Sequence, residues 1–130
     1  MTEKDRQGNR QNNRQLGTEK ETLAADYLVR RGARILERNF RCRQGEIDLI
    51  FRHEEYLVFG EVKYRKSQTA GAAMEAVGLA TQKKICRVAD YYRAIHGFGD
   101  GTSVRYDVIA IQGDRVSWIP NAFPHHYARG

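Results

Sequence analysis

The stretch Gly45–Arg65, GEIDLIFRHEEYLVFGEVKYR, is the part of the chain around which the fold is organised. It contains two short apolar runs separated by the polar residues 53–55, a break that is short enough for a hairpin loop. In the first run apolar and acidic residues alternate with the period of a β-strand, and the second run keeps the same period. The predicted faces of the second strand are Val58, Gly60 and Val62 on one side and Phe59, Glu61 and Lys63 on the other.

Two acids of this hairpin are expected to project from adjacent strands. Asp48 lies on the first strand and Glu61 on the second, with Lys63 two residues further along the same face. Converging carboxylates repel each other unless a cation lies between them. Mg²⁺ takes oxygen ligands and keeps several waters, so one or two carboxylates and a phosphate suffice to hold it.

This pattern of acids and Lys has a chemical use. Water bound to a divalent cation loses a proton far more readily than bulk water, and a neighbouring Lys can orient it or stabilise charge on a phosphate. The pattern therefore favours metal-assisted phosphodiester hydrolysis. The alternative is a half-solvated hairpin whose outer face carries an ordinary Glu–Lys pair, since charged alternation is common in antiparallel sheets.

Length and composition indicate one globular domain. The chain has 130 residues, of which 41% are hydrophobic and 29% charged. No apolar run approaches the roughly 18 residues of a membrane span, and no signal-peptide pattern is present, so we expect a cytoplasmic protein without a membrane anchor. Cys42 and Cys86 are far apart in the sequence and are expected to be free thiols rather than a disulfide or zinc ligands.

The charge distribution favours a polyanionic partner. The formal net charge is +6, and residues 1–43 hold eleven Lys and Arg against six Asp and Glu. Most of the basic residues are Arg, whose guanidinium group makes forked contacts with phosphate. A nucleic acid is therefore the expected partner. Solubility alone also accounts for a net charge of this size, so the charge identifies no substrate.

The remaining segments complete a predicted α/β fold. Residues 1–15 have no hydrophobic period and are expected to form a disordered polar tail. Apolar residues at helical spacing predict a helix over 16–31 that ends at Gly32. The order helix–strand–strand–strand–helix–strand–strand predicts a mixed sheet flanked by helices, in a single domain over 16–124. The other expected segments are a strand within 33–40, a turn at 41–44, a loop over 66–73, a helix over about 73–95, strands over 103–111 and 115–119, and a frayed end over 125–130.

Several further residues are candidates for a role in binding. Glu21 borders the buried stripe of the first predicted helix, where it is either part of a site or a surface acid near the helix start. Three arginines just before the acidic strand either contact phosphates or line a solvated turn, and the second predicted helix has a basic flank that solvent alone can explain. These residues are Arg38, Arg41 and Arg43 before the strand, and Lys83, Lys84 and Arg87 on the helix.

A set of motifs along the chain carries a family resemblance. They are Gly17-x-x-x-Glu21-x-x-Ala24, Asn39-Phe40-Arg41, Gly45-Glu46-Ile47-Asp48-Leu49-Ile50, Phe59-x-Glu61-Val62-Lys63-x-Arg65, Gln82-x-Lys84-Ile85, Arg105-Tyr106-Asp107-Val108 and Trp118-Ile119-x-Asn121-Ala122-Phe123. On these motifs the chain resembles the bacterial YraN-type proteins. That family is assigned to the restriction-endonuclease-like, or PD-(D/E)xK, superfamily and is distantly similar to archaeal Holliday-junction resolvases.

The resemblance implies a fold and an activity. It implies a restriction-endonuclease-like sheet and a Mg²⁺- or Mn²⁺-dependent endonuclease acting on structured, branched or damaged DNA. The implied catalytic residues are Asp48, Glu61, Lys63 and Glu21, with Asp48, Glu61 and Glu21 as metal ligands, Gln82 and Lys84 in support, and Arg38, Arg41, Arg43 and Arg65 on the DNA backbone. The alternative is a non-catalytic module with this fold that binds nucleic acid or recruits a partner. A homodimer would suit a two-fold symmetric junction, and a separate protein partner is a further expectation.

Overall fold

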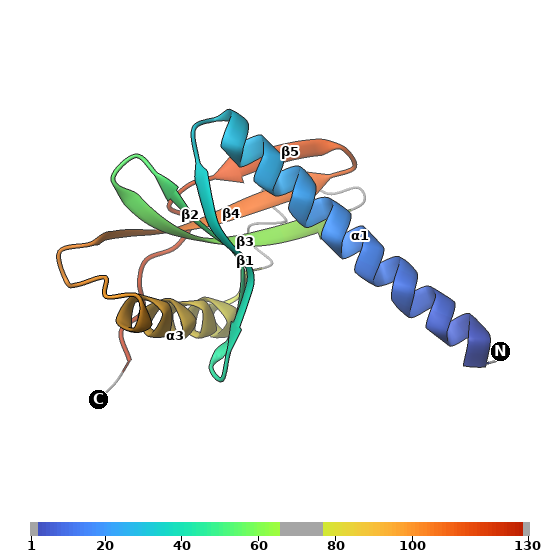
Figure 1. The fold of residues 1–130 in the computed structure, drawn as a ribbon, viewed down its shortest axis with the longest axis horizontal. Coiled ribbons are helices and arrows are strands. Elements are labelled where there is room, and N and C mark those ends of the chain that lie inside the picture. Colours follow the sequence, from blue (N-terminus) through green and yellow to red (C-terminus); the bar gives the residue numbers. More distant parts are fainter. Residues whose placement is uncertain (1–2, 66–76, 129–130) are drawn as a thin grey trace.

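Five strands form one mixed sheet with a helix on each side (Figure 1). The computed structural model describes the backbone of residues 3–65 and 77–128, and the side chains of residues 17–64 and 77–128. The strands lie in the order β1-β2-β3-β4-β5, and all neighbours are antiparallel except β3 and β4, which are parallel. This confirms the predicted order and the mixed sheet flanked by helices. The elements are α1 (Glu3–Arg30), β1 (Arg34–Cys42), β2 (Gly45–His53), β3 (Tyr56–Arg65), α3 (Leu79–Ile95), β4 (Ser103–Gln112) and β5 (Arg115–Ile119).

The predicted hairpin forms β2 and β3. Its turn consists of Glu54 and Glu55, and His53 lies opposite Tyr56 at the tip. Glu54 has a φ of 54°, the left-handed conformation that lets so short a connection reverse the chain. The central hairpin therefore has the strands and the turn that its sequence predicts.

Helix α1 begins earlier than the apolar pattern indicates. The predicted start was residue 16, whereas the helix extends back to Glu3 and its N-terminal part projects beyond the sheet (Figure 1). Residues 3–15 lack proline and contain three Arg and three Gln, which are good helix formers, beside three Asn and one Gly. Hydrophobic periodicity detects only the part of a helix that packs, so it misses a polar extension.

The two helix boundaries next to glycines follow local backbone geometry. Gly32, with a φ of 94°, follows α1, and the N–H of Ala33 donates to the carbonyl of Leu28 at 3.0 Å, which confirms the predicted stop. Helix α3 begins at Leu79, after Gly78 in an extended conformation. The predicted loop over 66–73 and the first residues of the helix expected from about 73 lie outside the described residues.

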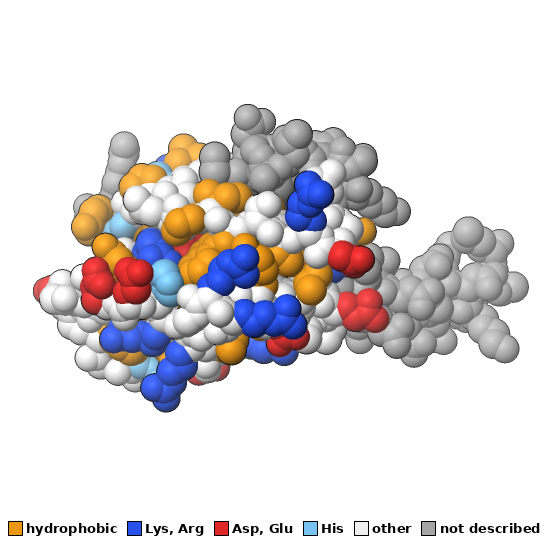
Figure 2. Space-filling view, turned by 90° about the horizontal axis from the view of Figure 1, so that it is seen from above, with side chains coloured by type: hydrophobic (Ala, Val, Ile, Leu, Met, Phe, Trp, Pro, Cys, Tyr) orange, Lys and Arg blue, Asp and Glu red, His pale blue; other side chains and the backbone are white. Residues whose placement is uncertain are grey.

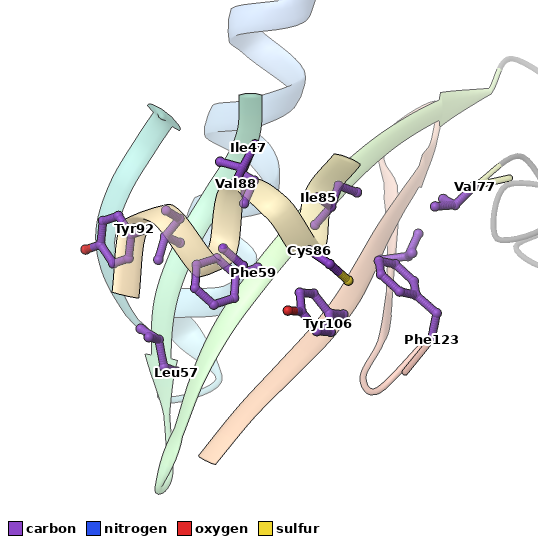
Figure 3. Close-up of a cluster of buried hydrophobic side chains, with 13 residues drawn as sticks. Ile47, Leu57, Phe59, Val77, Ile85, Cys86, Val88, Tyr92, Tyr106 and Phe123 are labelled. Carbon is purple, nitrogen blue, oxygen red and sulfur yellow. The ribbon is translucent and has the colours of Figure 1, made fainter. Parts of the chain in front are cut away.

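The sheet has a hydrophobic cluster on each face. On one face Ala24 and Leu28 of α1 pack against Phe51, Val58 and Ile109 of the sheet. On the other face α3 covers a second cluster, which Figure 3 shows with aromatic side chains at its centre. That second cluster includes Ile47, Leu57, Phe59, Val77, Ile85, Cys86, Val88, Tyr92, Tyr106 and Phe123.

Gly60 is required by the packing of the α1-side cluster. A Cβ atom at this position would lie 3.0 Å from Ile109 Cδ1 and 3.1 Å from Phe51 Cε1. Both distances are shorter than ordinary van der Waals contact. Close packing over this face of the strand therefore leaves little room for a side chain at Gly60.

A buried ion pair between Arg105 and Asp107 of β4 forms the centre of a hydrogen-bond network. Arg105 Nε and Nη2 each donate to the carboxylate of Asp107 at 2.9 Å, and Asp107 is fully buried. Asp107 also accepts from Trp118 Nε1 at 2.7 Å and from the N–H of Asn121 at 2.9 Å, while Arg105 Nη2 lies 3.1 Å from His53 Nδ1. This network ties β4 to β5, to the segment after β5 and to the hairpin tip.

The C-terminal segment, residues 124–128, is attached to β4 and α3 through His125 and His126. Tyr106 OH lies 2.6 Å from His125 Nδ1, and the N–H of His126 donates to Cys86 Sγ at 3.3 Å. At His125 and His126 this differs from the expected frayed end, because short-range patterns do not show tertiary hydrogen bonds; residues 129 and 130 lie outside the described part of the chain. Within the described ranges 3–65 and 77–128, neither helix combines the length and apolar character that a bilayer crossing requires.

The Asp107 network yields a stability prediction. Asp107→Ala leaves the Arg105 guanidinium buried without its partner, so we expect a loss of about 3–5 kcal/mol in the free energy of unfolding. Urea unfolding followed by Trp118 fluorescence measures it. Asp114→Ala, at an exposed turn position, is the control and should change stability by less than about 0.5 kcal/mol. Equal stability of the two variants would contradict the structural role of the network.

Two glycine substitutions should change stability in opposite directions. Gly60→Val places methyl groups against Ile109 and Phe51, so we expect it to lower the free energy of unfolding by about 1–3 kcal/mol. Gly17 lies within α1 with no atom within 4 Å of an added Cβ, so Gly17→Ala should raise it by up to about 1 kcal/mol. Chemical denaturation of both variants checks the signs, and a stabilising Gly60→Val would refute the close packing.

Candidate functional site

The candidate site lies where the hydrogen-bonded pairing of β2 with β3 stops. The pairs run from His53–Tyr56 to Leu49–Gly60. The next residue of β2 is Asp48, and its Oδ2 accepts a hydrogen bond from the backbone N–H of Val62 at 2.8 Å. In a continued β2–β3 ladder this N–H would donate to a backbone carbonyl of β2. Here the Asp48 side chain is the acceptor instead. This bond fixes the Asp48 carboxylate next to the β3 segment that carries Glu61.

Strand β2 twists at Asp48. Ile47 and Ile50 both pack in the cluster beneath α3, whereas Leu49 packs in the cluster beneath α1. Residues three apart on a regular strand face opposite sides, so the strand rotates between these residues. A Cβ on Gly45 would lie 3.4 Å from Val88 Cγ2, which places the start of the strand close to α3.

Glu61 and Lys63 form an ion pair on one face of β3. Lys63 Nζ lies 3.4 Å from Glu61 Oε1, and the side chains of Glu61 and Lys63 are 16% and 23% exposed. Residues two apart on a strand share a face, as the sequence predicts. The Lys is therefore fixed beside the second acid.

Burial disfavours the charged form of both carboxylates of this site. Burial, together with the nearby charge of Glu61, raises the pKa of Asp48 to about 7, while the Val62 hydrogen bond opposes the shift. Burial also raises the pKa of Glu61, and the Lys63 ammonium group opposes that shift. A proton or a cation at these carboxylates would relieve the cost of burying like charges.

Glu21 approaches this region from α1. Its Oε2 accepts a hydrogen bond from Asn39 Nδ2 of β1 at 2.8 Å, and its charge contributes to the raised pKa of Asp48. Asn39 has a φ of 54°, a conformation that Asn tolerates better than most residues. The two side chains line a pocket with Gly17, Thr18 and Arg41.

The donor set suits a divalent cation that keeps much of its water. Two half-buried carboxylates, Asp48 and Glu61, match the one or two protein carboxylates that usually hold Mg²⁺. The described part of the chain contains no group of three His, Cys, Asp or Glu side chains assembled as a metal site. Glu21 as a third ligand stays a prediction, because its carboxylate is held by Asn39.

The predicted supporting residues have other contacts. Gln82 Nε2 donates to the carbonyl of Val77 at 2.9 Å, and Gln82 Oε1 lies 2.8 Å from His126 Nε2. Lys84 is exposed on α3. The structure thus connects Gln82 to the C-terminal segment, and a role for Gln82 and Lys84 beside the acids stays a prediction.

Three of the four predicted DNA-contacting arginines lie at the surface of β1 and of the turn after it. Arg38 Nη2 donates to Thr22 Oγ1 at 2.9 Å, and Arg41 Nε lies 3.0 Å from Glu46 Oε2. Arg43 is exposed, and the side chain of Arg65 lies outside the described residues. Figure 2 shows that basic side chains on the face it presents lie among acidic and apolar ones.

Two polar residues of this region did not stand out as site residues in the sequence. Asn39 orients Glu21, and Glu46 both pairs with Arg41 and raises the pKa of Asp48. Both belong to motifs that carry the family resemblance, which was the available signal. The Asn39–Glu21 bond joins residues 18 apart in the sequence, which no short-range pattern shows, whereas Glu46 meets Arg41 because the two lie opposite each other in the β1–β2 pairing.

Fold and site together define a mixed α/β domain with a half-buried acid pair and a Lys at the end of its central hairpin. The chain belongs to the uncharacterised protein family UPF0102, whose model matches residues 20–111. It is 43% identical over 107 residues to a UPF0102 protein of Lachnoclostridium phytofermentans, covering 82% of this chain and 91% of that protein. A Vibrio vulnificus UPF0102 protein is 43% identical over 112 residues, covering 84% and 92%. These matches confirm the YraN-type resemblance.

The raised pKa of Asp48 predicts a pH-dependent stability. Between the ordinary Asp pKa of 3.8 and the raised pKa of about 7, the folded protein binds more protons than the unfolded chain, so this group's contribution to stability falls as pH rises through that interval. Asp48→Asn removes this loss, while its amide oxygen still accepts from Val62. We expect the variant to exceed the wild type by on the order of 1–3 kcal/mol at pH 8, with no gain at pH 4.

Urea unfolding across this pH range measures the difference. Asp114→Asn, in the exposed turn before β5, removes the same charge outside the site and is the control. A gain for Asp48→Asn that is independent of pH would contradict the proposed origin of the effect.

Proposed function

We propose that this protein is a Mg²⁺- or Mn²⁺-dependent phosphodiesterase that cleaves DNA as an endonuclease and has a restriction-endonuclease-like fold. The observation that supports this most is the half-buried pair Asp48 and Glu61 on adjacent strands, with Lys63 3.4 Å from Glu61. An acid pair that disfavours its own charge, next to a fixed ammonium group, suits phosphoryl chemistry better than it suits stability.

Each residue of the site has a role in this proposal. Asp48 and Glu61 would hold the cation, with Glu21 close enough to add negative charge. The bound cation would neutralise charge on the phosphate and make water a stronger nucleophile. Lys63, positioned by its ion pair, would donate to a phosphate oxygen or orient the attacking water. Val62 keeps Asp48 in place through its N–H.

The proposed substrate follows from charge and from the family resemblance. The net charge of +6 favours a polyanion. Arg38, Arg41 and Arg43 would contact backbone phosphates next to the acids, and Arg65 ends the strand that carries Glu61 and Lys63. The resemblance to resolvases favours branched, nicked or otherwise damaged DNA over a regular duplex.

A non-catalytic nucleic-acid-binding module is the second candidate. One observation favours it: Lys63 already neutralises Glu61, so the pair has a structural explanation without a metal. This candidate predicts salt-sensitive DNA binding without metal-dependent turnover. The two candidates therefore differ in what a divalent cation does to the protein and to bound DNA.

Cleavage and metal binding test the proposal together. With Mg²⁺ or Mn²⁺ we expect wild-type protein to cut branched or nicked DNA, and Asp48→Asn or Lys63→Ala to lower the rate by at least about 100-fold because a charge-stabilising group is lost. Mn²⁺ should raise the unfolding temperature of the wild type at pH 8 but not that of Asp48→Asn.

Asp114→Asn is the control, since it removes an exposed acid outside the site. Cleavage that survives both site substitutions would refute the assigned residues. DNA binding without any response to Mn²⁺ would favour the non-catalytic module.

A further inference from the structure

A second pocket lies between α3 and the C-terminal segment, residues 124–128. It has a volume of about 640 Å³ and shares no lining residue with the acid site. Among the residues that the structure describes, its lining contains basic, aromatic and small side chains and no carboxylate. The lining residues are Lys83, Arg87, His125, His126, Tyr127 and Ala128.

One wall of this pocket carries two cations without counter-charges. Lys83 and Arg87 are four residues apart on α3, so they lie on the same face of the helix, where like charges destabilise it slightly. Among the described residues, neither takes part in an ion pair, whereas Arg93 of the same helix pairs with Asp90. An anion bound between them would relieve this repulsion.

The other wall is held rigidly against the helix. His126 is fixed through its N–H to Cys86 Sγ at 3.3 Å and through its ring to Gln82 Oε1 at 2.8 Å. His125 is fixed through Tyr106 OH at 2.6 Å, and its Nε2 lies 3.5 Å from Asp90 Oδ1. A wall that is already ordered adds little conformational entropy cost to binding.

The contacts of Gln82 fix the orientation of the His126 ring. Gln82 Nε2 donates to the carbonyl of Val77, so its amide oxygen faces His126. His126 therefore donates through Nε2. Gln82 is thus a positioning residue for this pocket, which gives a physical reason for a polar residue on the half-buried side of α3.

We propose that this pocket binds a backbone phosphate of a nucleic acid, with Lys83 and Arg87 as the donors and the C-terminal segment as a fixed wall. Arg offers a forked donor pair and Lys a mobile point charge, a combination that suits phosphate oxygens. The pocket is much larger than one phosphate group, which fits a polymer that brings nucleoside on either side of it. This site needs no metal, so it would operate in the nuclease and in the non-catalytic module alike.

DNA affinity without divalent cations tests the proposal. Fluorescence anisotropy with a labelled duplex in EDTA should show that Lys83→Gln with Arg87→Gln weakens binding about 5- to 10-fold near physiological salt. The slope of log affinity against log salt should fall by about 1–2, because up to two phosphate contacts are lost. His126→Ala keeps both cations but loosens the wall, and we expect it to weaken binding about 2- to 3-fold.

A matched pair of substitutions controls for net charge. Arg30→Gln with Arg34→Gln also removes two exposed cations, but at the end of α1 and the start of β1. It should weaken binding less than about 2-fold. Equal losses in the two double variants would overturn the proposal, and thermal unfolding verifies that each variant is folded.

Two further measurements identify the ligand and separate this site from the acid site. Inorganic phosphate followed by ¹H–¹⁵N NMR tests a free anion: saturable shifts at Lys83, Arg87 and His126, together with unchanged DNA affinity in the double variant, would overturn the nucleic-acid assignment. In EDTA, Lys83→Gln with Arg87→Gln should weaken DNA binding by the same factor in the Asp48→Asn background as in the wild type, because the two sites share no described lining residue. If the wild type cuts no DNA with Mn²⁺ while Lys83→Gln with Arg87→Gln still weakens binding in EDTA, the metal-dependent proposal fails and the phosphate site stands.

Discussion

The hydrogen bond from the N–H of Val62 to Asp48 Oδ2 is the interaction on which the candidate site depends. It stands where the β2–β3 pairing ends, at the Leu49–Gly60 pair. Without a side-chain acceptor there, the strand donor of Val62 would have to find another partner, at a cost typical of a buried unpaired group. The same bond holds one acid beside the segment that presents Glu61 and Lys63. The end of the β2–β3 pairing and the placement of the acids therefore depend on the same hydrogen bond.

Parallel pairing of β3 with β4 sets the environment of that arrangement. The two strands are paired over ten residues, from Tyr56–Ser103 to Arg65–Gln112, so β3 lies inside the sheet between β2 and β4 and not at its edge. Glu61 and Lys63 are therefore far less exposed than charged residues on an edge strand would be. Burial of this kind is costly for charges, and it is the main cause of the raised pKa values.

The sequence predicted most of the sheet and the composition of the acid pair, because both rest on short-range patterns. Alternation over residues 45–65 is enough to define β2 and β3, and the i, i+2 spacing is enough to put Glu61 beside Lys63. Short-range patterns did not predict contacts between distant segments. These contacts are the Asn39–Glu21 bond, the Asp107 network and the attachment of His126 to α3. The polar extension of α1 was missed for a different reason, since it packs no apolar stripe that a pattern could reveal.

The hydrogen bond that the C-terminal segment makes to Cys86 also has a chemical consequence. The thiol is completely buried, and burial raises its pKa, so at neutral pH it is a poor nucleophile. The N–H of His126 lies against its sulfur at 3.3 Å. Cys86 also lies in the cluster between α3 and the sheet, so an alkylating reagent can reach this sulfur only when the packing around it opens. The alkylation rate of Cys86 therefore measures how often this packing beneath α3 opens.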